Sequence, residues 1–309
     1  MHKYNEEQIG ILYIDFNNKE RELISDELGQ GVVSDAVFER NTLVQEQLNV
    51  VFEYFEKTEV TQVATAQSLD IQSGQGDYDI VVNGTFLAIQ PALEGKYVEL
   101  SELENMNTSK HYWSQGFNDM VTFSGIQYLA SGSMAISMSS FTYVTLYNRN
   151  LFDENQQKYR SYVQDQVSSF GISAVVGDGD RREMLAAVLE AMAYHSHILV
   201  RPAYYEVTLS SRYMQDPQSK EILDLIFDSL YFDFSSTCSN LVPACVIRDH
   251  LRPILSGKKI QFLPPLAPGR GPCKGPWTST TNRWLSLCPD AGYPYVKNAP
   301  SVHLPAGAY

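Results

Sequence analysis

The sequence predicts an α/β fold in which crossover helices cover a parallel sheet. Strand-like and helix-like segments alternate along the first half of the chain, which is the order that builds such a sheet. With 309 residues, 44% of them hydrophobic and 19% charged, the composition is globular and the length suits about two domains. We therefore expect an α/β lobe over residues 1–151, and a return segment followed by helices over 152–262.

The first half of the chain has the clearest patterns. Short runs in which apolar and polar residues alternate, or which are rich in β-branched residues, predict strands. Apolar residues three and four positions apart predict helices. Ser34 is the expected N-cap of the first helix, because it precedes the periodic apolar residues. The expected elements are a strand over 9–16, a helix from 34 to about 48, a strand over 49–56, a helix over 60–69 and a strand over 78–84.

The second half is richer in helices. A β-hairpin is expected around Ser124 and Gly125, because Ser-Gly favours a tight turn. Asp216 and Pro217 are expected as the cap and the first residue of a helix. The further expected elements are a strand over 141–148 and helices over 180–200, 202–213 and 216–232.

Residues 263–309 differ from the rest of the chain. They hold nine of its fourteen prolines and one acidic residue, Asp290, and neither the helix period nor the strand period persists there. Two interpretations remain open, a proline-rich disordered tail and a segment translated from a shifted reading frame.

Charge and apolar content exclude several classes of protein. A net charge of −13 argues against a nucleic-acid partner, which needs clustered Lys and Arg. The pairs Arg181-Arg182 and Lys258-Lys259 are expected at solvated helix ends. No run approaches the length of a transmembrane helix, and the start of the chain lacks the pattern of a signal peptide. The protein is thus expected to be cytosolic or the mature form of an exported protein.

The cysteine pattern gives no metal or redox motif. None of the paired C-x-x-C spacings of zinc and redox sites occurs among Cys238, Cys245, Cys273 and Cys288. A disulfide between Cys238 and Cys245 stays open for an exported protein, because spacing alone does not establish it.

No local motif predicts catalysis, a metal or a cofactor. His195 and His197 would point about 200° apart on a helix and could not share a metal ion. Asp178 and Asp180 lack the other ligands of a calcium loop, and are expected in a loop and helix cap. The common nucleophile, phosphate-loop and zinc-protease motifs do not occur. We therefore expect a non-enzyme without cofactor or metal.

Four segments of the sequence occur in a characteristic order. They are DAVFERNTLVQEQLNV at 35–50, GDYDIVVNGTF at 76–86, YWSQGFND at 112–119 and AAVLEAMAYHS at 186–196. In this order they resemble the extracellular solute-binding proteins of bacterial ABC importers, in the sugar-binding-like family 1 branch. The resemblance covers roughly residues 9–257 and includes the stretch 228–234.

The resemblance implies a type II periplasmic-binding-protein-like fold, in which two α/β lobes close on a ligand by hinge bending. The chain would cross to the second lobe at 141–151 and return at 158–173. Between Leu151 and Phe152 the family places most of the second lobe, on the order of 100 to 150 residues, which this chain lacks. We expect one largely complete lobe and an internally deleted copy of such a protein. A legitimate compact variant is the alternative.

Polar residues follow two of the predicted strands. In open α/β sheets ligands bind beyond the carboxyl ends of the strands. Asp15 and Asn17 follow the first strand, and Asn83, Gly84 and Thr85 follow the strand over 78–84. Carboxylates and amides can hydrogen-bond sugar hydroxyls, so these five residues are candidate ligand contacts. The alternative is that they only form turns.

Aromatic residues supply the other candidates. An indole face stacks on the apolar face of a sugar ring, which makes Trp113 the best single ligand contact. Tyr143, Tyr204 and Tyr205 are further candidates of the same kind. Packing in the core is the alternative role for each.

Together these features predict the receptor component of an ABC transporter that binds a carbohydrate between its lobes. The implied partners are a sugar or oligosaccharide and a membrane permease, and a monomer is expected. The implied location is extracellular or periplasmic. The family's export signal and lipid-attached cysteine are missing from this chain. The alternatives are a remnant without ligand affinity and an extracytoplasmic hydrolase that uses groups such as His111 and Asp119.

Overall fold

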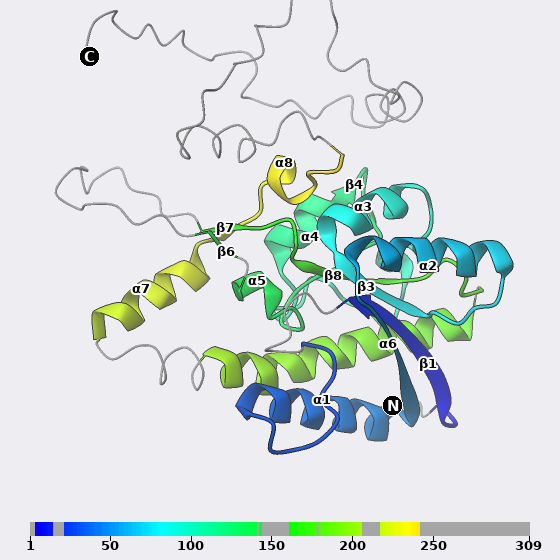
Figure 1. Cartoon of the computed structure of the whole chain (residues 1–309), viewed down its shortest axis with the longest axis horizontal. Coiled ribbons are helices and arrows are strands. Elements are labelled where there is room, and N and C mark those ends of the chain that lie inside the picture. Colours follow the sequence, from blue (N-terminus) through cyan, green and yellow to red (C-terminus); the bar gives the residue numbers. More distant parts are fainter. Residues whose placement is uncertain are drawn as a thin grey trace, which may run out of the picture. The chain divides into compact units, whose positions relative to one another are not determined.

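The computed structural model describes residues 4–14, 22–140, 142–143, 161–177, 179–205 and 217–241 (Figure 1). The chain divides into two compact units, Met1–Lys259 and Ile260–Tyr309, and all described residues belong to the first. The junction at Leu151 and Phe152 and the proline-rich segment 263–309 lie outside the described residues. The predicted lobe and helical part therefore remain predictions.

The main sheet has four strands in the order β2-β1-β3-β8. β1 pairs in parallel with β2 and with β3, as the alternating pattern predicts, whereas β8 runs antiparallel to β3. β3 and β8 are buried at every position, which explains their continuous apolar and small residues. The strands are β1 (Glu7–Ile14), β2 (Val50–Lys57), β3 (Ile80–Gly84) and β8 (Ser168–Ile172).

Helices cover both faces of this sheet (Figure 1). Because β2 and β3 lie on opposite sides of β1, right-handed crossovers place α1 on one face and α2 on the other. α6 lies beside α1, and α3 lies beside α2. The mixed α/β fold with an open sheet is thus confirmed. The covering helices are α1 (Val32–Leu48), α2 (Val60–Ser73), α3 (Thr85–Leu93) and α6 (Asp180–His195), which continues into a π-helical turn, Ser196–Val200.

The start of α1 differs from the prediction. The N-cap is Gly31, so Ser34 lies inside the helix and the expectation that it caps the helix is wrong. The carboxylate of Asp35 accepts a hydrogen bond of 2.7 Å from the N–H of Gly29, which orders the loop before the helix. An acidic side chain in the first turn also interacts favourably with the helix dipole.

Smaller elements complete the described part. Ser124 and Gly125 have positive φ angles of 54° and 84° and connect β4 to β5, which confirms the predicted hairpin. β6, β7 and β9 form a second sheet. α7 begins at Pro217 as predicted, but it ends at Asp228, and Leu230–Tyr231 form β9 where the helix over 216–232 was expected to continue. These elements are η1 (Leu100–Glu102), α4 (Gln115–Val121), β4 (Thr122–Phe123), β5 (Ile126–Gln127), α5 (Ser137–Ser140), β6 (Thr142–Tyr143), β7 (Ser161–Val163), α7 (Pro217–Asp228), β9 (Leu230–Tyr231) and α8 (Phe234–Thr237).

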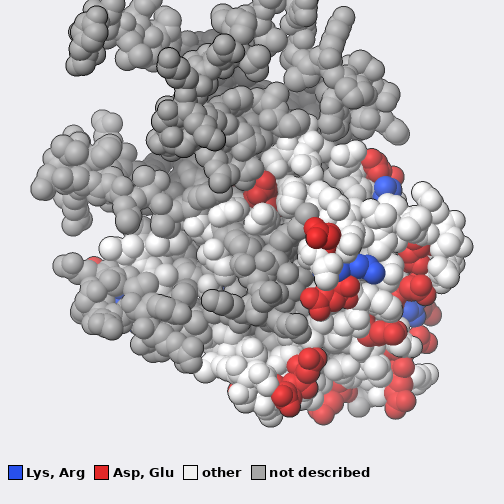
Figure 2. All heavy atoms as spheres, viewed as in Figure 1, with Lys and Arg blue, Asp and Glu red and all other residues white. Residues whose placement is uncertain are grey.

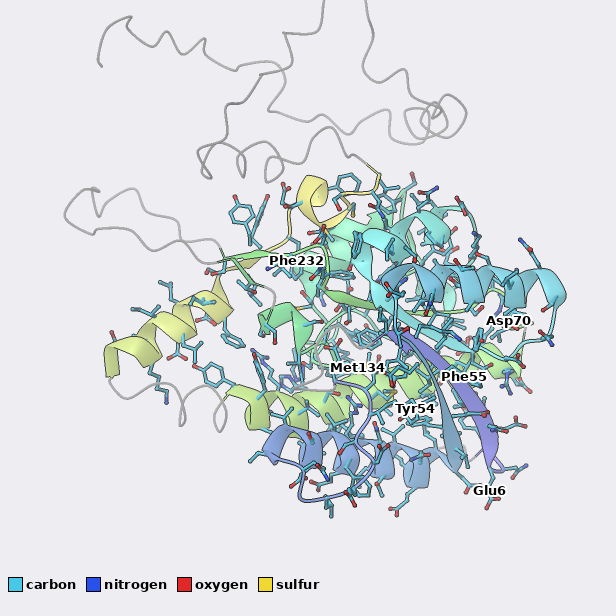
Figure 3. The ribbon with its side chains drawn as sticks, viewed as in Figure 1. Glu6, Tyr54, Phe55, Asp70, Met134 and Phe232 are labelled. Carbon is cyan, nitrogen blue, oxygen red and sulfur yellow. The ribbon has the colours of Figure 1, made fainter. Side chains whose placement is uncertain are left out.

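The hydrophobic core joins the main sheet to the covering helices. Met134 and Phe232, labelled in Figure 3, belong to this core, and Met134 is completely buried. A smaller cluster connects Val37 of α1 with Ile136 and Tyr204. Cys238 is buried as a free thiol, whereas Cys245 lies outside the described residues. The core therefore packs residues after position 160 against β1, β2 and β3.

The surface agrees with the acidic composition. Figure 2 shows that carboxylates outnumber basic groups on the visible described face and gather over the region of α1, β1 and β2. Within the described ranges, no helix is both long and apolar enough to cross a membrane.

Arg181 corrects another expectation. It lies at the start of α6 but is not simply solvated, because its Nη2 lies 2.8 Å from Oδ2 of Asp79. The carboxylate of Asp79 is buried and also accepts a 2.9 Å hydrogen bond from the N–H of Gly10. This ion pair fastens the first turn of α6 to β1 and to the start of β3.

Candidate functional site

The carboxyl ends of β1 and β3 lie side by side, since these strands are neighbours in the sheet. α1 follows β1 and α3 follows β3 onto opposite faces of the sheet, which makes this edge the usual position of a ligand crevice. Asp15 and Asn17, predicted for this edge, lie outside the described residues.

Asn83, Gly84 and Thr85 form the described end of β3 and the start of α3. Asn83 and Thr85 are buried, with 1% and 0% of their surfaces exposed. Thr85 Oγ1 donates a 2.8 Å hydrogen bond to the carbonyl of Val167, and Asn83 Oδ1 accepts one of 2.9 Å from Gly84 N. Both side chains therefore bond to the chain itself through these oxygen atoms.

Glu22 closes the same edge and is a residue that the sequence analysis missed. Its Oε2 accepts a 2.9 Å hydrogen bond from the N–H of Ser137, and its Oε1 accepts hydrogen bonds from the hydroxyls of Ser137 and Ser168. Ser168 lies opposite Gly84 across the β3–β8 pairing. No local pattern could reveal this cluster, because three distant segments contribute to it.

Arg40 holds the segment that contains Glu22. Its guanidinium is completely buried and donates hydrogen bonds of 2.9 and 3.0 Å to the carbonyls of Glu22 and Leu23. It also donates to Asn41 Oδ1 and to the hydroxyl of Ser196. Burial lowers the pKa of Arg40 to about 10, which still leaves it protonated at neutral pH. A buried cation thus connects α1, the segment after β1 and the π-helical turn.

A cavity of about 180 Å³, the Trp113 cavity, brings together two of the predicted ligand contacts. Trp113 and Tyr204 both line it, although they lie far apart in the sequence. The lining consists of His111, Tyr112, Trp113, Ser114, Gly132, Ser133, Ala135, Ile136, Met138, Ser139, Arg201, Tyr204, Phe227 and Leu230.

Trp113 is held tightly, with 3% of its surface exposed. Its backbone forms an antiparallel bridge with Gly132, and its indole Nε1 donates a 2.9 Å hydrogen bond to Glu190. A Cβ atom on Gly132 would lie 2.4 Å from the carbonyl oxygen of Tyr112, so only glycine permits this close approach. The ring position is therefore set by backbone contact and by α6.

Polar groups surround the aromatic lining. The hydroxyls of Tyr204 and Ser140 lie 3.0 Å apart, and His197 Nδ1 lies 3.2 Å from Ser133 Oγ. The rings of His111 and His197 meet edge to face at 4.6 Å. Burial, and then the nearby His111 and Arg201, lower the pKa of His197, so it is neutral at pH 7. The cavity wall can therefore donate and accept hydrogen bonds beside apolar rings.

Of the other two aromatic candidates, Tyr205 is not in the lining of this cavity, and Tyr143 is described by its backbone alone. Tyr143 lies in β6 opposite Tyr162, and the placement of its side chain falls outside what the structure describes. The ring of Tyr205 packs edge to face on Phe227 at 5.0 Å. Two of the four aromatic candidates therefore converge on one cavity.

Candidate metal ligands do not converge. His195 Nε2 lies 2.9 Å from Gln47 Oε1, whereas His197 contacts Ser133. Asp180 is the first residue of α6, and Asp178 lies outside the described residues. Among the residues that the structure describes, no three His, Cys, Asp or Glu side chains are grouped to hold a metal ion.

Comparison with known proteins gives matches only at the level of structure. No family model and no curated protein matches the chain. The mannitol-bound ABC transporter solute-binding protein of Agrobacterium vitis S4 is 13% identical with a TM-score of 0.28, over 40% of this chain and 26% of that one. The chain thus spans 26% of the length of that protein.

Two further solved structures are ABC or periplasmic binding proteins. The maltose complex of the maltose-binding periplasmic protein from Listeria monocytogenes is 8% identical with a TM-score of 0.42, over 84% of this chain and 100% of that one. The spermidine/putrescine substrate-binding protein of Streptococcus pneumoniae is 10% identical with a TM-score of 0.32, over 73% of this chain and 92% of that one. The fold class of this chain rests on its own strand pairing and helix placement.

Proposed function

We propose that this chain is a solute-binding receptor of an ABC importer and that it binds a carbohydrate in the Trp113 cavity. The observation that carries the proposal is the convergence of Trp113 and Tyr204 on one cavity. Each was a candidate for stacking on a sugar ring from its residue type and sequence context alone. The resemblance of the segments at 112–119 and 186–196 to solute-binding proteins supports the same function.

The lining suits a sugar better than a fully apolar ligand. Trp113 and Tyr204 contribute apolar character to the lining, while Ser139, His111 and Arg201 supply groups that hydrogen-bond hydroxyls. The cavity of about 180 Å³ is smaller than the roughly 300 Å³ at which pockets for drug-sized ligands begin. We therefore expect one sugar ring, or the terminal ring of an oligosaccharide, to enter it.

Binding of this kind needs no covalent step. Stacking and hydrogen bonds would hold the solute, and a membrane permease would receive it. The proposed location is outside the cytoplasm, as the resemblance to extracellular solute-binding proteins implies.

The test is a thermal-unfolding screen of the full chain by circular dichroism, with and without a panel of monosaccharides and disaccharides. A ligand present at about ten times its Kd stabilises the folded state by about 1.4 kcal/mol, which raises Tm. We expect at least one sugar to raise Tm in the wild type. Tyr204→Ala should abolish the effect, while Tyr162→Phe, at an exposed position in β7, should preserve it.

Two results would overturn the proposal. If no sugar and no other small solute raises Tm, the chain has no ligand affinity, as expected for a remnant. If a sugar raises the Tm of Tyr204→Ala as much as that of the folded wild type, the ligand binds away from the Trp113 cavity.

A further inference from the structure

A second and larger cavity, the α6 cavity, lies against α6. Its volume is about 350 Å³, within the range of roughly 300 to 1,000 Å³ that small-molecule sites occupy. Three tyrosine rings and one carboxylate are prominent in its lining. The residues on which the argument depends are Tyr4, Tyr112, Ala187, Glu190, Ala191 and Tyr194.

The helix itself creates the space. Ala187, Glu190, Ala191 and Tyr194 are separated by three and four positions, so they share one face of α6. The two alanines leave room above the helix, and Glu190 and Tyr194 border it. A larger side chain at position 187 would fill this space.

Two of the tyrosine rings in the lining pack edge to face. The rings of Tyr112 and Tyr194 are nearly perpendicular, at 79°, and their centroids are 5.9 Å apart. Tyr4 lines the same cavity, and its backbone N–H donates a 2.7 Å hydrogen bond to the carbonyl of Leu48. The face of a tyrosine ring carries partial negative charge and attracts a cation.

The ionised side chain in the lining of the α6 cavity is a carboxylate. Among the described lining residues, Glu190 is acidic and none is Lys or Arg. The Glu190 carboxylate is held by the hydroxyl of Tyr112 and the indole N–H of Trp113. Burial, and then Glu183 and Asp180, raise the pKa of Tyr4, which shows that further negative charge acts at this ring.

The histidine in the lining does not oppose a cation. His195 lies at the end of α6, with its Nε2 2.9 Å from Gln47 Oε1. Burial, and then the charge of Arg40, lower its pKa, so the imidazole is neutral at pH 7. The cavity therefore combines aromatic faces, a carboxylate and a neutral imidazole.

We propose that the α6 cavity binds a small organic ammonium ion, with its charge between the tyrosine rings and the Glu190 carboxylate. A cation with methyl or methylene groups suits this lining, because the groups contact the rings and the alanines while the charge meets the carboxylate. This site is distinct from the Trp113 cavity, although Tyr112 borders both.

The test uses choline and tetramethylammonium as probes, with 3,3-dimethylbutan-1-ol as the uncharged analogue of choline. Binding to the full chain is measured by isothermal titration calorimetry. We expect both cations to bind, and the neutral alcohol to bind at least about tenfold more weakly than choline. Ala187→Leu should abolish binding, because the added side chain occupies the cavity.

Tyr194 offers a matched pair of variants, since 46% of its surface is exposed and substitution there spares the core. Tyr194→Phe keeps the ring and should change the Kd of choline by less than about twofold. Tyr194→Leu removes the ring and should weaken binding by about three- to thirtyfold.

Three outcomes would overturn the proposal. They are absence of cation binding to folded protein, equal binding of choline and the neutral alcohol, and equal affinity in Tyr194→Leu and Tyr194→Phe. If Ala187→Leu fails to fold, the two Tyr194 variants and the neutral alcohol still test whether the cavity binds a cation. A folded Ala187→Leu variant that keeps full affinity would also place the ligand elsewhere.

Discussion

The indole nitrogen of Trp113 donates a 2.9 Å hydrogen bond to the carboxylate of Glu190. The same carboxylate accepts hydrogen bonds from the hydroxyl of Tyr112 and the backbone N–H of Asn107. One residue of α6 thereby holds the segment that leads to the Trp113 cavity and also borders the α6 cavity. The orientation of Trp113 therefore depends on a helix that lies far away in the sequence.

Removing Glu190 should destabilise the protein. Glu190→Ala leaves the N–H of Trp113 and the O–H of Tyr112 without their acceptor, and we expect a loss of about 2 to 3 kcal/mol in the free energy of unfolding. Glu190→Gln keeps one acceptor oxygen and should lose less. Urea unfolding followed by circular dichroism measures the difference. Glu104→Gln, at an exposed position, is the control, and a Glu190→Ala variant as stable as this control would contradict the prediction.

The ion pair between buried Asp79 and partly exposed Arg181 leads to a second prediction. Asp79→Ala removes the acceptor for Arg181 and for the N–H of Gly10, and should cost about 2 to 4 kcal/mol. Glu7→Gln removes only the negative charge from the exposed 3.1 Å contact with Arg181 and should cost less than about 1 kcal/mol. Chemical denaturation of the two variants measures the difference. Equal losses would show that the contact of Arg181 with Asp79 contributes no more to stability than its contact with Glu7.

Gly132 provides a steric test of the Trp113 cavity. The methyl group of Gly132→Ala would lie 2.4 Å from the carbonyl oxygen of Tyr112 and 2.8 Å from Trp113 Cα, both backbone atoms that can move only with the chain. We expect a loss of about 1 to 3 kcal/mol and the loss of any ligand response in the cavity. Gly177→Ala, where no heavy atom lies within 4 Å of the added carbon, is the matched control. Identical thermal unfolding of both variants would refute the steric argument.

His195 should contribute to the dependence of stability on pH. Its pKa is lowered in the folded state by burial, and then by Arg40, so the unfolded chain takes up the proton first on acidification. Stability should therefore fall as pH drops below about 6.5, the ordinary histidine pKa, and this loss should continue down to the folded pKa. His195→Gln should make the free energy of unfolding less dependent on pH in this window. His197, whose pKa is also lowered, should add to the slope in the same direction.

The measurement is urea unfolding at pH 5.5 and 7.5 for the wild type and His195→Gln. The comparison between the two pH values cancels any constant effect of the substitution on stability. An unchanged difference between the two pH values in the variant would exclude a role for His195.

Local patterns were sufficient for most of the elements that surround the site. The strand and helix periods predicted β1, β2 and β3 together with α1, α2 and α6, because alternation and helical spacing are set by near neighbours. The Ser124–Gly125 turn was predictable for the same reason. The start of α1 was misplaced, because Gly31 rather than Ser34 is the cap. The end of the helix expected over 216–232 was also misplaced, because α7 ends at Asp228 and Leu230–Tyr231 form β9.

The candidate site was predictable in part. The residue types of Trp113 and Tyr204 suggested ligand contact, and both line the Trp113 cavity. Glu22 and Glu190 were missed, since a single acidic residue on a loop or a helix carries no signal of the partners that it meets in the fold. Arg181 was taken for a solvated helix end because its partner Asp79 lies a hundred or so positions earlier.

The sequence by itself determined the alternation of strands and helices, the acidic surface and the kinds of side chain available for binding. The tertiary structure alone decided that β8 runs antiparallel to β3, that Glu190 orients Trp113, and which aromatic rings share a cavity. The physical reason is the difference in sequence separation between the residues that interact. Backbone periodicity depends on residues a few positions apart, whereas a buried hydrogen bond or a cavity wall depends on packing between segments that meet only in the folded chain.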